Sequence, residues 1–198
     1  MTVLAWDIGT SGVKAVVVDR DGTVMASAQR GYPLVARDDG WVEQDLDEIE
    51  AACVAATREL LDGGAVAGDV EAIGLTAQMF DLAPVDANGR STMPMLSWLD
   101  QRAAVQAVEL EARIPRAEQA VLFGSIVTAK DVIPKMIWLR DRAPEDWAAT
   151  RWLLDCKEAI VLRLTGRAVI DPAGALAFRL YDPVAGEWSE AACARAGV

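Results

Sequence analysis

The sequence predicts an α/β fold in which helices flank a mixed β-sheet. Three observations carry this prediction. Apolar runs of strand length open the chain, an amphipathic helical pattern follows them, and further strand and helix patterns come after it. Hydrophobic residues make up 53% of the 198 residues, which is enough apolar surface for a packed core. The sequence contains neither repeats nor a clear linker, so we expect residues 1–198 to form one domain.

Three strands are predicted near the N-terminus. The apolar runs at residues 3–6 and 13–18 are typical of buried strands, and a glycine-rich turn joins them. The Asp21-Gly22 pair favours a tight hairpin, so residues 23–29 are expected to form a third strand, antiparallel to the second. Residues 40–45 are expected to be a connector that leads to a helix.

A long helix is predicted to begin after Asp45 and to end at Gly63. Asp45 and Glu48 have the spacing of a capping box. One face carries the apolar side chains that would pack against the sheet: Leu46, Ile49, Cys53, Ala56 and Leu60. Residues 70–76 form the next predicted strand. The order of three strands, a helix and a fourth strand is distinctive of the ribonuclease H-like fold, which actins, chaperone ATPases and sugar kinases share. Such a fold analogy does not by itself establish function.

The second half of the chain is predicted to be mainly helical. A short strand is expected to end at Val85. Helices are expected at residues 100–113, 131–143, 155–164 and close to the C-terminus. Asp100 and Asp131 would begin two of these helices, and Gly166 would end the third. Turns are expected at residues 86–89, 171–172 and 182–183.

Residues 7–14, Asp-Ile-Gly-Thr-Ser-Gly-Val-Lys, have the composition of a phosphate-binding hairpin. The glycines allow backbone N–H groups to approach an anion closely, while hydroxyl groups and one lysine add donors and charge. The residues predicted to surround the phosphates are Gly9, Thr10, Ser11 and Lys14. Asp7 would supply a carboxylate for a Mg²⁺ ion that accompanies the phosphates, through water. The alternative is an ordinary glycine-rich hairpin with a solvated Asp7.

Composition excludes several function classes. The chain has no histidine, which removes Ser/His and Cys/His nucleophilic systems and zinc sites with the usual ligands. The net charge of −11 opposes a broad nucleic-acid interface, although it does not exclude a nucleotide. The three cysteines lie far apart, as expected in a reducing cytosol. Because neither a leader nor a membrane-spanning apolar run is visible, we expect a soluble, cytoplasmic protein without a membrane partner.

Five motifs give the chain a family resemblance. They are Asp-Ile-Gly-Thr-Ser-Gly-Val-Lys at residues 7–14, Gly-Trp-Val-Glu-Gln-Asp at 40–45, Ile-Gly-Leu-Thr-Ala-Gln-Met at 73–79, Ser-Trp-Leu-Asp-Gln-Arg-Ala at 97–103 and Arg-Leu-Thr-Gly at 163–166. In this order and spacing, they resemble the FGGY carbohydrate kinases, most closely the xylulokinase-like members. The resemblance covers essentially the whole chain and corresponds to the N-terminal domain of that family.

The resemblance implies ATP- and Mg²⁺-dependent phosphorylation of a sugar or polyol hydroxyl. It assigns Gly9, Thr10, Ser11 and Lys14 to the terminal phosphates and Asp7 to the metal. Five further residues would line the sugar side: Gln78, Met79, Trp98, Asp100 and Arg102. Trp98 offers an apolar face to sugar C–H groups, and the polar members can bind hydroxyl groups or hold one another. Alternatively, Trp98 packs in the core, Asp100 caps a helix, and Arg102 simply pairs with Asp100.

Two departures from the family pattern affect the expected chemistry. Phe80 and Asp81 stand where xylulokinases have a histidine and a glycine, so xylulose is not implied as the substrate. The family's catalytic aspartate and its second, ATP-binding domain lie beyond the part that this chain matches. Asp7, Asp81 and Asp100 each have a better assignment than catalytic base. We therefore expect the base beyond residue 198 and no turnover by this polypeptide alone.

Two other readings stay open at this stage. One is a non-catalytic domain, derived from a sugar kinase, that senses sugar or binds another protein. The other is a different ribonuclease H-like ATPase. The resemblance also implies a sheet that lacks its last strand, and an unpaired edge favours self-association.

Overall fold

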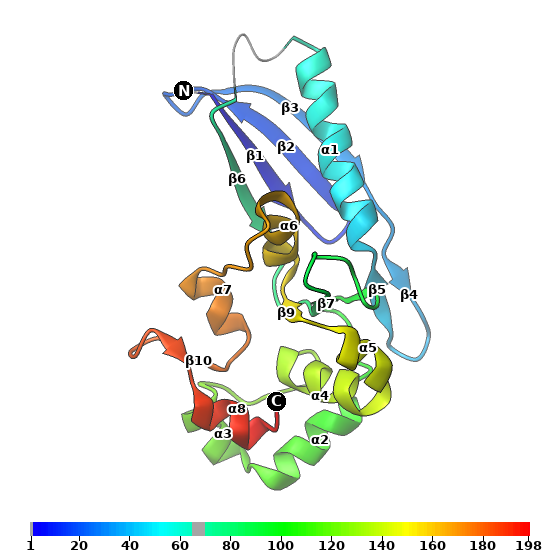
Figure 1. Ribbon diagram of the computed structural model, residues 1–198, viewed down its shortest axis with the longest axis vertical. Coiled ribbons are helices and arrows are strands. Elements are labelled where there is room, and N and C mark those ends of the chain that lie inside the picture. Colours follow the sequence, from blue (N-terminus) through cyan, green and yellow to red (C-terminus); the bar gives the residue numbers. More distant parts are fainter. Residues whose placement is uncertain (1, 65–69) are drawn as a thin grey trace. The chain divides into compact units, whose positions relative to one another are not determined.

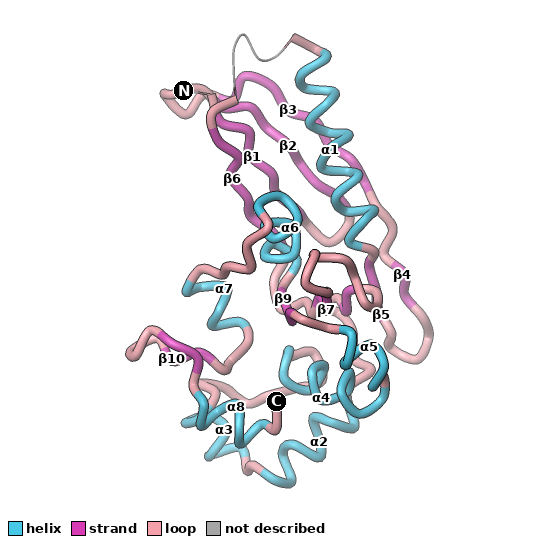
Figure 2. Tube along the Cα trace, viewed as in Figure 1, coloured by secondary structure: helices cyan, strands magenta, loops and turns pink. Residues whose placement is uncertain are grey.

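The computed structural model describes residues 2–64 and 70–198, and these residues form two compact units. The first, which we call the sheet unit, comprises the chain up to Leu34 together with Gln44–Gln78. The second, the helical unit, comprises Val35–Glu43 and Met79–Val198. Figure 2 shows the difference in content: long strands with one long helix in the first unit, and mainly helices and loops in the second.

The sheet unit contains a four-stranded mixed sheet (Figure 1). Its strands are β1 (Val3–Ile8), β2 (Gly12–Val18), β3 (Val24–Gly31) and β6 (Ala72–Ala77), in the order β3-β2-β1-β6. The first three strands are antiparallel neighbours, whereas β6 runs parallel to β1. The predicted strands are therefore confirmed. Parallel pairing of β6 requires a crossover, which helix α1 (Leu46–Asp62) provides.

Helix α1 is defined by its caps and its apolar face. Asp45 is the N-cap, and its side chain accepts a hydrogen bond from the Asp47 N–H at 2.8 Å. Gly63 ends the helix, and Gly64 follows with a φ of 70°, in the left-handed region that favours glycine. All five predicted apolar side chains are buried, and α1 packs against β1, β2 and β3. This burial fixes the sheet behind the hairpin that joins β1 and β2.

The helical unit contains short strands and seven helices within the described residues. The strands are β4 (Val35–Ala36), β5 (Val42–Gln44), β7 (Ala83–Val85), β8 (Met95–Leu96), β9 (Trp152–Leu154), β10 (Tyr181–Asp182) and β11 (Glu187–Trp188); the last residue of β5 already belongs to the sheet unit. The helices are α2 (Ala104–Arg113), α3 (Arg116–Leu122), α4 (Val132–Arg142), α5 (Pro144–Ala149), α6 (Cys156–Thr165), α7 (Pro172–Ala177) and α8 (Glu190–Ala196). Three small sheets join β4-β5-β8, β7-β9 and β10-β11.

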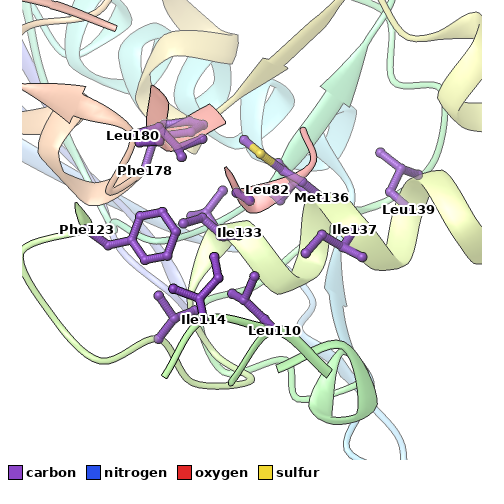
Figure 3. Close-up of a cluster of buried hydrophobic side chains, with 14 of the residues drawn as sticks. Leu82, Leu110, Ile114, Phe123, Ile133, Met136, Ile137, Leu139, Phe178 and Leu180 are labelled. Atoms are coloured by element: carbon purple, nitrogen blue, oxygen red, sulfur yellow. The ribbon is translucent and has the colours of Figure 1, made fainter. Parts of the chain in front are cut away.

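The core of the helical unit gathers around α4. Figure 3 shows Ile133, Met136 and Ile137 of this helix among apolar side chains from α2, from the segment after α7 and from Phe123. Ile133 is fully buried, and Lys135 on the same helix is fully buried too. A lysine in such a place needs polar partners. Its partners are backbone carbonyls, and they belong to the candidate site.

Several predictions about local structure are wrong in detail. Asp100 does not cap α2, which begins at Ala104, because Arg102 and the Val42 N–H bind its carboxylate. Residues 171–172 are the start of α7 and not merely a turn, since Asp171 caps the Ala173 N–H and Pro172 takes the first helical position. The connector at residues 40–45 contains β5, while α3 and α5 were not predicted.

Candidate functional site

The glycine-rich loop between β1 and β2 is held through its carbonyl groups. The Tyr32 hydroxyl donates to the Gly9 carbonyl, and the Tyr32 N–H donates to the Ser11 carbonyl at 3.4 Å. The Gln44 side-chain amide donates to the Thr10 carbonyl at 2.9 Å. Carbonyl oxygens repel an anion, so binding three successive carbonyls to the protein suits a phosphate site. Sequence reasoning missed Tyr32 and Gln44 as supports, although Gln44 lies inside one of the five motifs.

A cavity of about 410 Å³ lies beside this loop. Its lining comprises Asp7, Gly9, Ser11, Gly12, Val13, Lys14, Gln29, Arg30 and Gly31. Asp7 and Lys14 are register partners across β1 and β2, and both are exposed. The structure therefore brings the predicted metal carboxylate and the predicted phosphate lysine to one cavity.

Gly12 is required by the close approach of β3. A Cβ atom at this position would lie 2.5 Å from the Arg30 carbonyl oxygen, closer than atoms in contact can be. The loop is tightened further by a hydrogen bond of 2.9 Å from the Gly9 N–H to the Gly12 carbonyl. The second glycine of the motif is thus needed for strand packing as well as for the turn.

The donor set beside the loop fits a magnesium ion only in the company of phosphates. Within residues 2–64 and 70–198, no group of three or more acidic, cysteine or histidine side chains could hold a metal ion. Mg²⁺ usually keeps several waters and binds one or two carboxylates together with substrate phosphates, rather than a cage of protein ligands. The single carboxylate of Asp7 agrees with binding of Mg²⁺ together with phosphates, and not with a cage of protein ligands.

Gln78 is connected to the loop within the sheet unit. Its side-chain amide donates to the Gln44 Oε1 atom at 2.7 Å, and Gln44 in turn donates to the Thr10 carbonyl. The Gln78 Oε1 atom is buried and has no hydrogen-bond partner among the described residues. A buried acceptor of this kind is costly unless a ligand or water supplies the donor. Gln78 therefore stays a plausible contact for a bound molecule.

Asp100 and Arg102 form a buried ion pair in the helical unit. Arg102 Nη2 lies 2.8 Å from the Asp100 Oδ2 atom and 2.8 Å from the Glu43 Oε1 atom. The guanidinium carbon stands 3.8 Å from the ring centroid of Trp41 and 5.0 Å from that of Trp138. Asp100 also accepts the Val42 N–H at 2.6 Å.

The contacts to Trp41, Val42 and Glu43 fix the segment 41–43 to residues 100–102. Both side chains are fully buried, and both Asp100 oxygens already accept hydrogen bonds. The reading in which Arg102 pairs with Asp100 is therefore confirmed. A direct contact of either residue with a sugar stays a prediction.

A second buried cluster fixes Phe80 and Trp98. Asp81 accepts the Trp98 N–H at 2.7 Å, Asp155 accepts the Phe80 N–H at 2.9 Å, and Lys135 Nζ donates to the carbonyls of Phe80 and Ser97. Sequence reasoning missed this cluster, which joins four segments that lie apart in the chain: residues 80–81, 97–98, 135 and 155. Asp81 was quoted as a departure from the family pattern, which was the one available signal.

Burial dominates the titration of this cluster. Desolvation and the neighbouring Asp155 carboxylate hold the pKa of Asp81 well above its usual range. Burial also raises the pKa of Asp155 to about 6 and lowers the pKa of Lys135 to about 8. Such shifts arise in functional sites as well as in structural networks.

Phe80 and Trp98 line a cavity of about 220 Å³ within the helical unit. The other lining residues are Thr128, Lys130, Asp131 and Arg179. Trp98 is 37% exposed and Met79 is 42% exposed, so neither is a plain core residue. Trp98, the predicted sugar contact, therefore forms part of a cavity wall. Residues 128–131 and Arg179 carry no motif, and no signal in the sequence alone pointed to them.

Among the described helices, none has both the length and the apolar character that crossing a membrane requires.

The chain is similar to known kinases over its whole length. Residues 2–198 match the sequence profile of the FGGY family of carbohydrate kinases, N-terminal domain. The chain is 30% identical over 190 residues to the xylulose kinase of Escherichia coli (strain K12), covering 93% of this chain and 37% of that protein. It is 32% identical over 200 residues to the glycerol kinase of Bordetella pertussis, covering 95% and 39%.

Comparison of structures agrees with the sequence matches. The xylulose kinase from Rhodospirillum rubrum superposes with a TM-score of 0.91 at 26% identity, over 100% of this chain and 42% of that one. The predicted ribonuclease H-like α/β fold and the predicted family resemblance are confirmed. The chain spans about two fifths of the length of the curated relatives it matches.

Proposed function

Since the chain belongs to the FGGY family of carbohydrate kinases, as an N-terminal domain of that family, we propose that the protein containing it phosphorylates a hydroxyl group of a sugar or polyol, with ATP and Mg²⁺. The observation that carries this proposal is the glycine-rich loop, whose carbonyls are bound by Tyr32 and Gln44 beside the exposed pair Asp7 and Lys14. ATP with its Mg²⁺ would supply the phosphoryl group that is transferred.

At the loop, each residue has a role in binding the phosphates. The hydroxyl groups of Thr10 and Ser11 are proposed to donate to the phosphates, an arrangement helped by the engagement of the loop carbonyls elsewhere. Gly9 is proposed to shape the loop beside the phosphates, since its N–H donates to the Gly12 carbonyl and its carbonyl accepts from Tyr32. Lys14 adds a positive charge at the cavity, and Asp7 would hold a Mg²⁺ ion that accompanies the phosphates, through water. Tyr32 and Gln44 position the loop without contacting the phosphates.

The sugar side is proposed to use the cavity of the helical unit. Trp98 presents an apolar face to sugar C–H groups, and the exposed Met79 side chain is proposed to offer another. Gln78, which belongs to the sheet unit, is proposed separately to offer its buried acceptor to a hydroxyl group. Asp100 and Arg102 act indirectly, by holding Trp41 and the segment 41–43 in place. We propose them as positioning residues for substrate binding.

The proton acceptor is proposed to lie outside these 198 residues. Transfer needs a carboxylate within hydrogen-bond reach of the attacking hydroxyl. Asp81 and Asp100 are fully buried and engaged with backbone N–H groups, while Asp7 serves the metal. We further propose that the adenosine site lies on a second domain and that the protein is cytoplasmic. Self-association is proposed to use the edge of the sheet at β6.

The engagement of the buried Asp81 and Asp100 carboxylates with backbone N–H groups motivates a second candidate function. In that reading the domain binds a sugar or a protein partner without phosphoryl transfer. The two candidate functions can be distinguished by measurement. A non-catalytic sugar-binding domain would be stabilised by sugar but not by nucleotide.

A thermal-shift experiment tests the proposal. Because the proposal places the adenosine site on a second domain, the whole protein that contains this chain is titrated with a panel of ketoses, aldoses and polyols, with and without ATP and Mg²⁺. At a ligand concentration one hundredfold above Kd, binding should stabilise the chain by about 2.7 kcal/mol. Lys14→Met should abolish the nucleotide shift and preserve the sugar shift, and Trp98→Ala should do the reverse. Arg167→Met, an exposed charge on the helical unit, is the matched control. A chain that responds to neither class of ligand contradicts the proposal.

A further inference from the structure

Two unusual backbone conformations meet at the cavity of the helical unit. Among the described residues, Phe80 and Arg179 are the two non-glycine residues with positive φ, at 69° and 59°. Both line the 220 Å³ cavity, and the Arg179 guanidinium carbon lies 5.7 Å from the centroid of the Phe80 ring. Such conformations are strained for residues with a side chain, and they gather at functional sites, ligand clamps among them. Their presence at one cavity indicates a surface shaped for a ligand.

Each of the two residues is held in place by buried polar groups. The Phe80 N–H donates to Asp155 and its carbonyl accepts from Lys135. Arg179 Nε donates to Asp131 Oδ1 at 2.7 Å. The other Asp131 oxygen accepts both the N–H and the hydroxyl of Thr128. The wall carrying Arg179 is therefore as firmly fixed as the wall carrying Phe80.

The Arg179 end of the cavity carries unneutralised positive charge. Arg179 uses only Nε toward Asp131, and its Nη groups have no hydrogen bond or ion pair within the described residues. Lys130 lines the same cavity, is exposed, and likewise has no ion pair there. The cavity lining thus carries two cations and one carboxylate, whose oxygens are both occupied. This local excess stands out in a chain with a net charge of −11.

The donor groups at the Arg179 end of the cavity favour an anion as ligand. The two Nη groups of a guanidinium present parallel N–H donors that match a carboxylate or phosphate in bidentate fashion, and a nearby ammonium group adds a point charge. The adjoining Trp98 and Phe80 rings offer apolar surface to C–H groups. A cavity of 220 Å³ suits a small ligand, since drug-sized ligands occupy about 300–1,000 Å³.

We propose that Arg179 and Lys130 bind the carboxylate of a sugar acid, so that the substrate is a polyhydroxy carboxylate and not a neutral sugar. This inference rests on the proposed function, because it names the substrate class of the same sugar side. Trp98 and Phe80 bind the carbon chain, and the hydroxyl to be phosphorylated lies away from the carboxylate end.

Isothermal titration calorimetry of the chain with matched pairs tests the inference. The pairs are xylonate with xylitol and gluconate with glucitol, which differ at one end only. Hydrogen bonds to charged groups contribute about 1.5–3 kcal/mol, so each acid should bind about 10- to 100-fold more tightly than its polyol. Xylulose 5-phosphate forms a third arm, because a phosphate group could satisfy the same donors. Tighter binding of the sugar phosphate than of both acids would overturn the carboxylate assignment.

Variants locate the effect. Lys130→Gln and Arg179→Gln should each reduce the preference for the acid about tenfold and leave polyol binding unchanged. Lys130 is exposed, so its substitution leaves folding intact even if Arg179→Gln does not. Arg167→Gln, an exposed arginine of the same unit, is the matched control and should keep the full preference. An acid preference that survives both substitutions would overturn the assignment.

The experiment separates the two proposals. Equal binding of acids and polyols overturns the carboxylate inference and leaves the proposed function standing. Failure of every sugar, polyol and sugar acid to bind overturns both. Raising the salt concentration should weaken the acids selectively, since the ion contact lies at a partly exposed site.

Discussion

The two cavities use charged side chains in opposite ways. At the glycine-rich loop, Asp7 and Lys14 are exposed, and the loop is held by contacts to its backbone. At the cavity of the helical unit, the walls are held by buried charges such as Asp81 and Lys135. In the first region charge is available for a ligand and structure comes from glycine. In the second region, most of the charged groups hold the walls of the cavity in place.

This difference decides which substitutions are costly. A charge that is exposed contributes about 0–1 kcal/mol through an ion pair, because water and salt screen it. Removing one partner of a buried pair costs about 3–5 kcal/mol, since the other charge is left without compensation. Substitutions of exposed charged residues should therefore change ligand binding, whereas substitutions of buried charged residues should change stability.

The largest expected effect comes from Arg102→Met. The variant leaves Glu43 and the fully buried Asp100 without their cation, and the free energy of unfolding should fall by about 3–5 kcal/mol. Urea denaturation followed by tryptophan fluorescence measures the loss. Arg37→Met is the control: its side chain is 58% exposed and lies 3.9 Å from Glu43, so the loss should stay below about 1 kcal/mol. Equal losses in the two variants would remove the distinction between the regions.

Gly12→Ala should be the most harmful change at the loop. The added Cβ would lie 2.5 Å from the Arg30 carbonyl, and overpacking of this kind costs about 1–3 kcal/mol. Nucleotide binding should be lost as the loop moves. Gly74→Ala in β6 is the control, because its nearest neighbour would be a side-chain atom at 4.0 Å. Calorimetric titration with ATP and Mg²⁺ tests both variants, and normal binding by Gly12→Ala would contradict the role given to backbone geometry.

Asp81→Asn should change how stability depends on pH. Burial raises the pKa of Asp81 well above its usual range and that of Asp155 to about 6, so the folded state binds more protons than the unfolded state once the pH rises above about 4. The stability due to these groups is complete at low pH and is lost as the pH rises, by at most about 1.4 kcal/mol per pH unit for each proton.

The asparagine variant removes the Asp81 part of this slope, so its stability relative to the parent chain should increase with pH. Urea denaturation at a series of pH values measures the slope. Asp141→Asn, on an exposed ion pair, should keep the parental slope. A parental slope in Asp81→Asn would mean that Asp81 ionises in the folded chain as it does in the unfolded one.

Tyr32→Phe should have the smallest effect. It deletes one hydrogen bond to the Gly9 carbonyl, and such a loss costs about 1 kcal/mol. The phenyl ring keeps the packing, so the change should appear as weaker nucleotide binding with nearly normal stability. Arg30→Lys is a useful comparison, because it alters a side chain near the cavity without touching the loop carbonyls. Unchanged nucleotide affinity in Tyr32→Phe would show that the loop holds its shape without this anchor.

The sequence predicted the sheet unit better than the helical unit, for a physical reason. Strand periodicity, the Asp21-Gly22 turn and the capped helix are local signals, and the loop needs only the glycines that its own sequence contains. The walls of the second cavity come from segments as far apart as Phe80 and Arg179. Their meeting depends on buried hydrogen bonds such as those from Asp155 to the Phe80 and Asp81 N–H groups. Such long-range pairs leave no periodic pattern in the sequence from which they could be predicted.

Asp100 illustrates the same limit on a smaller scale. An aspartate before a helical pattern is typical of an N-cap. Here the guanidinium of Arg102, two residues later, binds the carboxylate bidentately, and the Val42 N–H completes its bonding. Tertiary partners outcompete the helix end, and α2 begins at Ala104.

The threading of the chain also bears on how the molecule forms during synthesis. Residues 35–43 belong to the helical unit, yet the sheet unit precedes and follows them in the chain. Their partners arrive late: the Val42 N–H binds Asp100, 58 residues further on, and the Gly40 carbonyl accepts the Gln101 N–H. The sheet unit has all its strands once residue 77 is made. During synthesis the sheet unit can therefore be complete while the hairpin of β4 and β5 still lacks its partners at residues 100–101. Because closing so long a loop is costly, we expect docking of this hairpin to be a late, slow step.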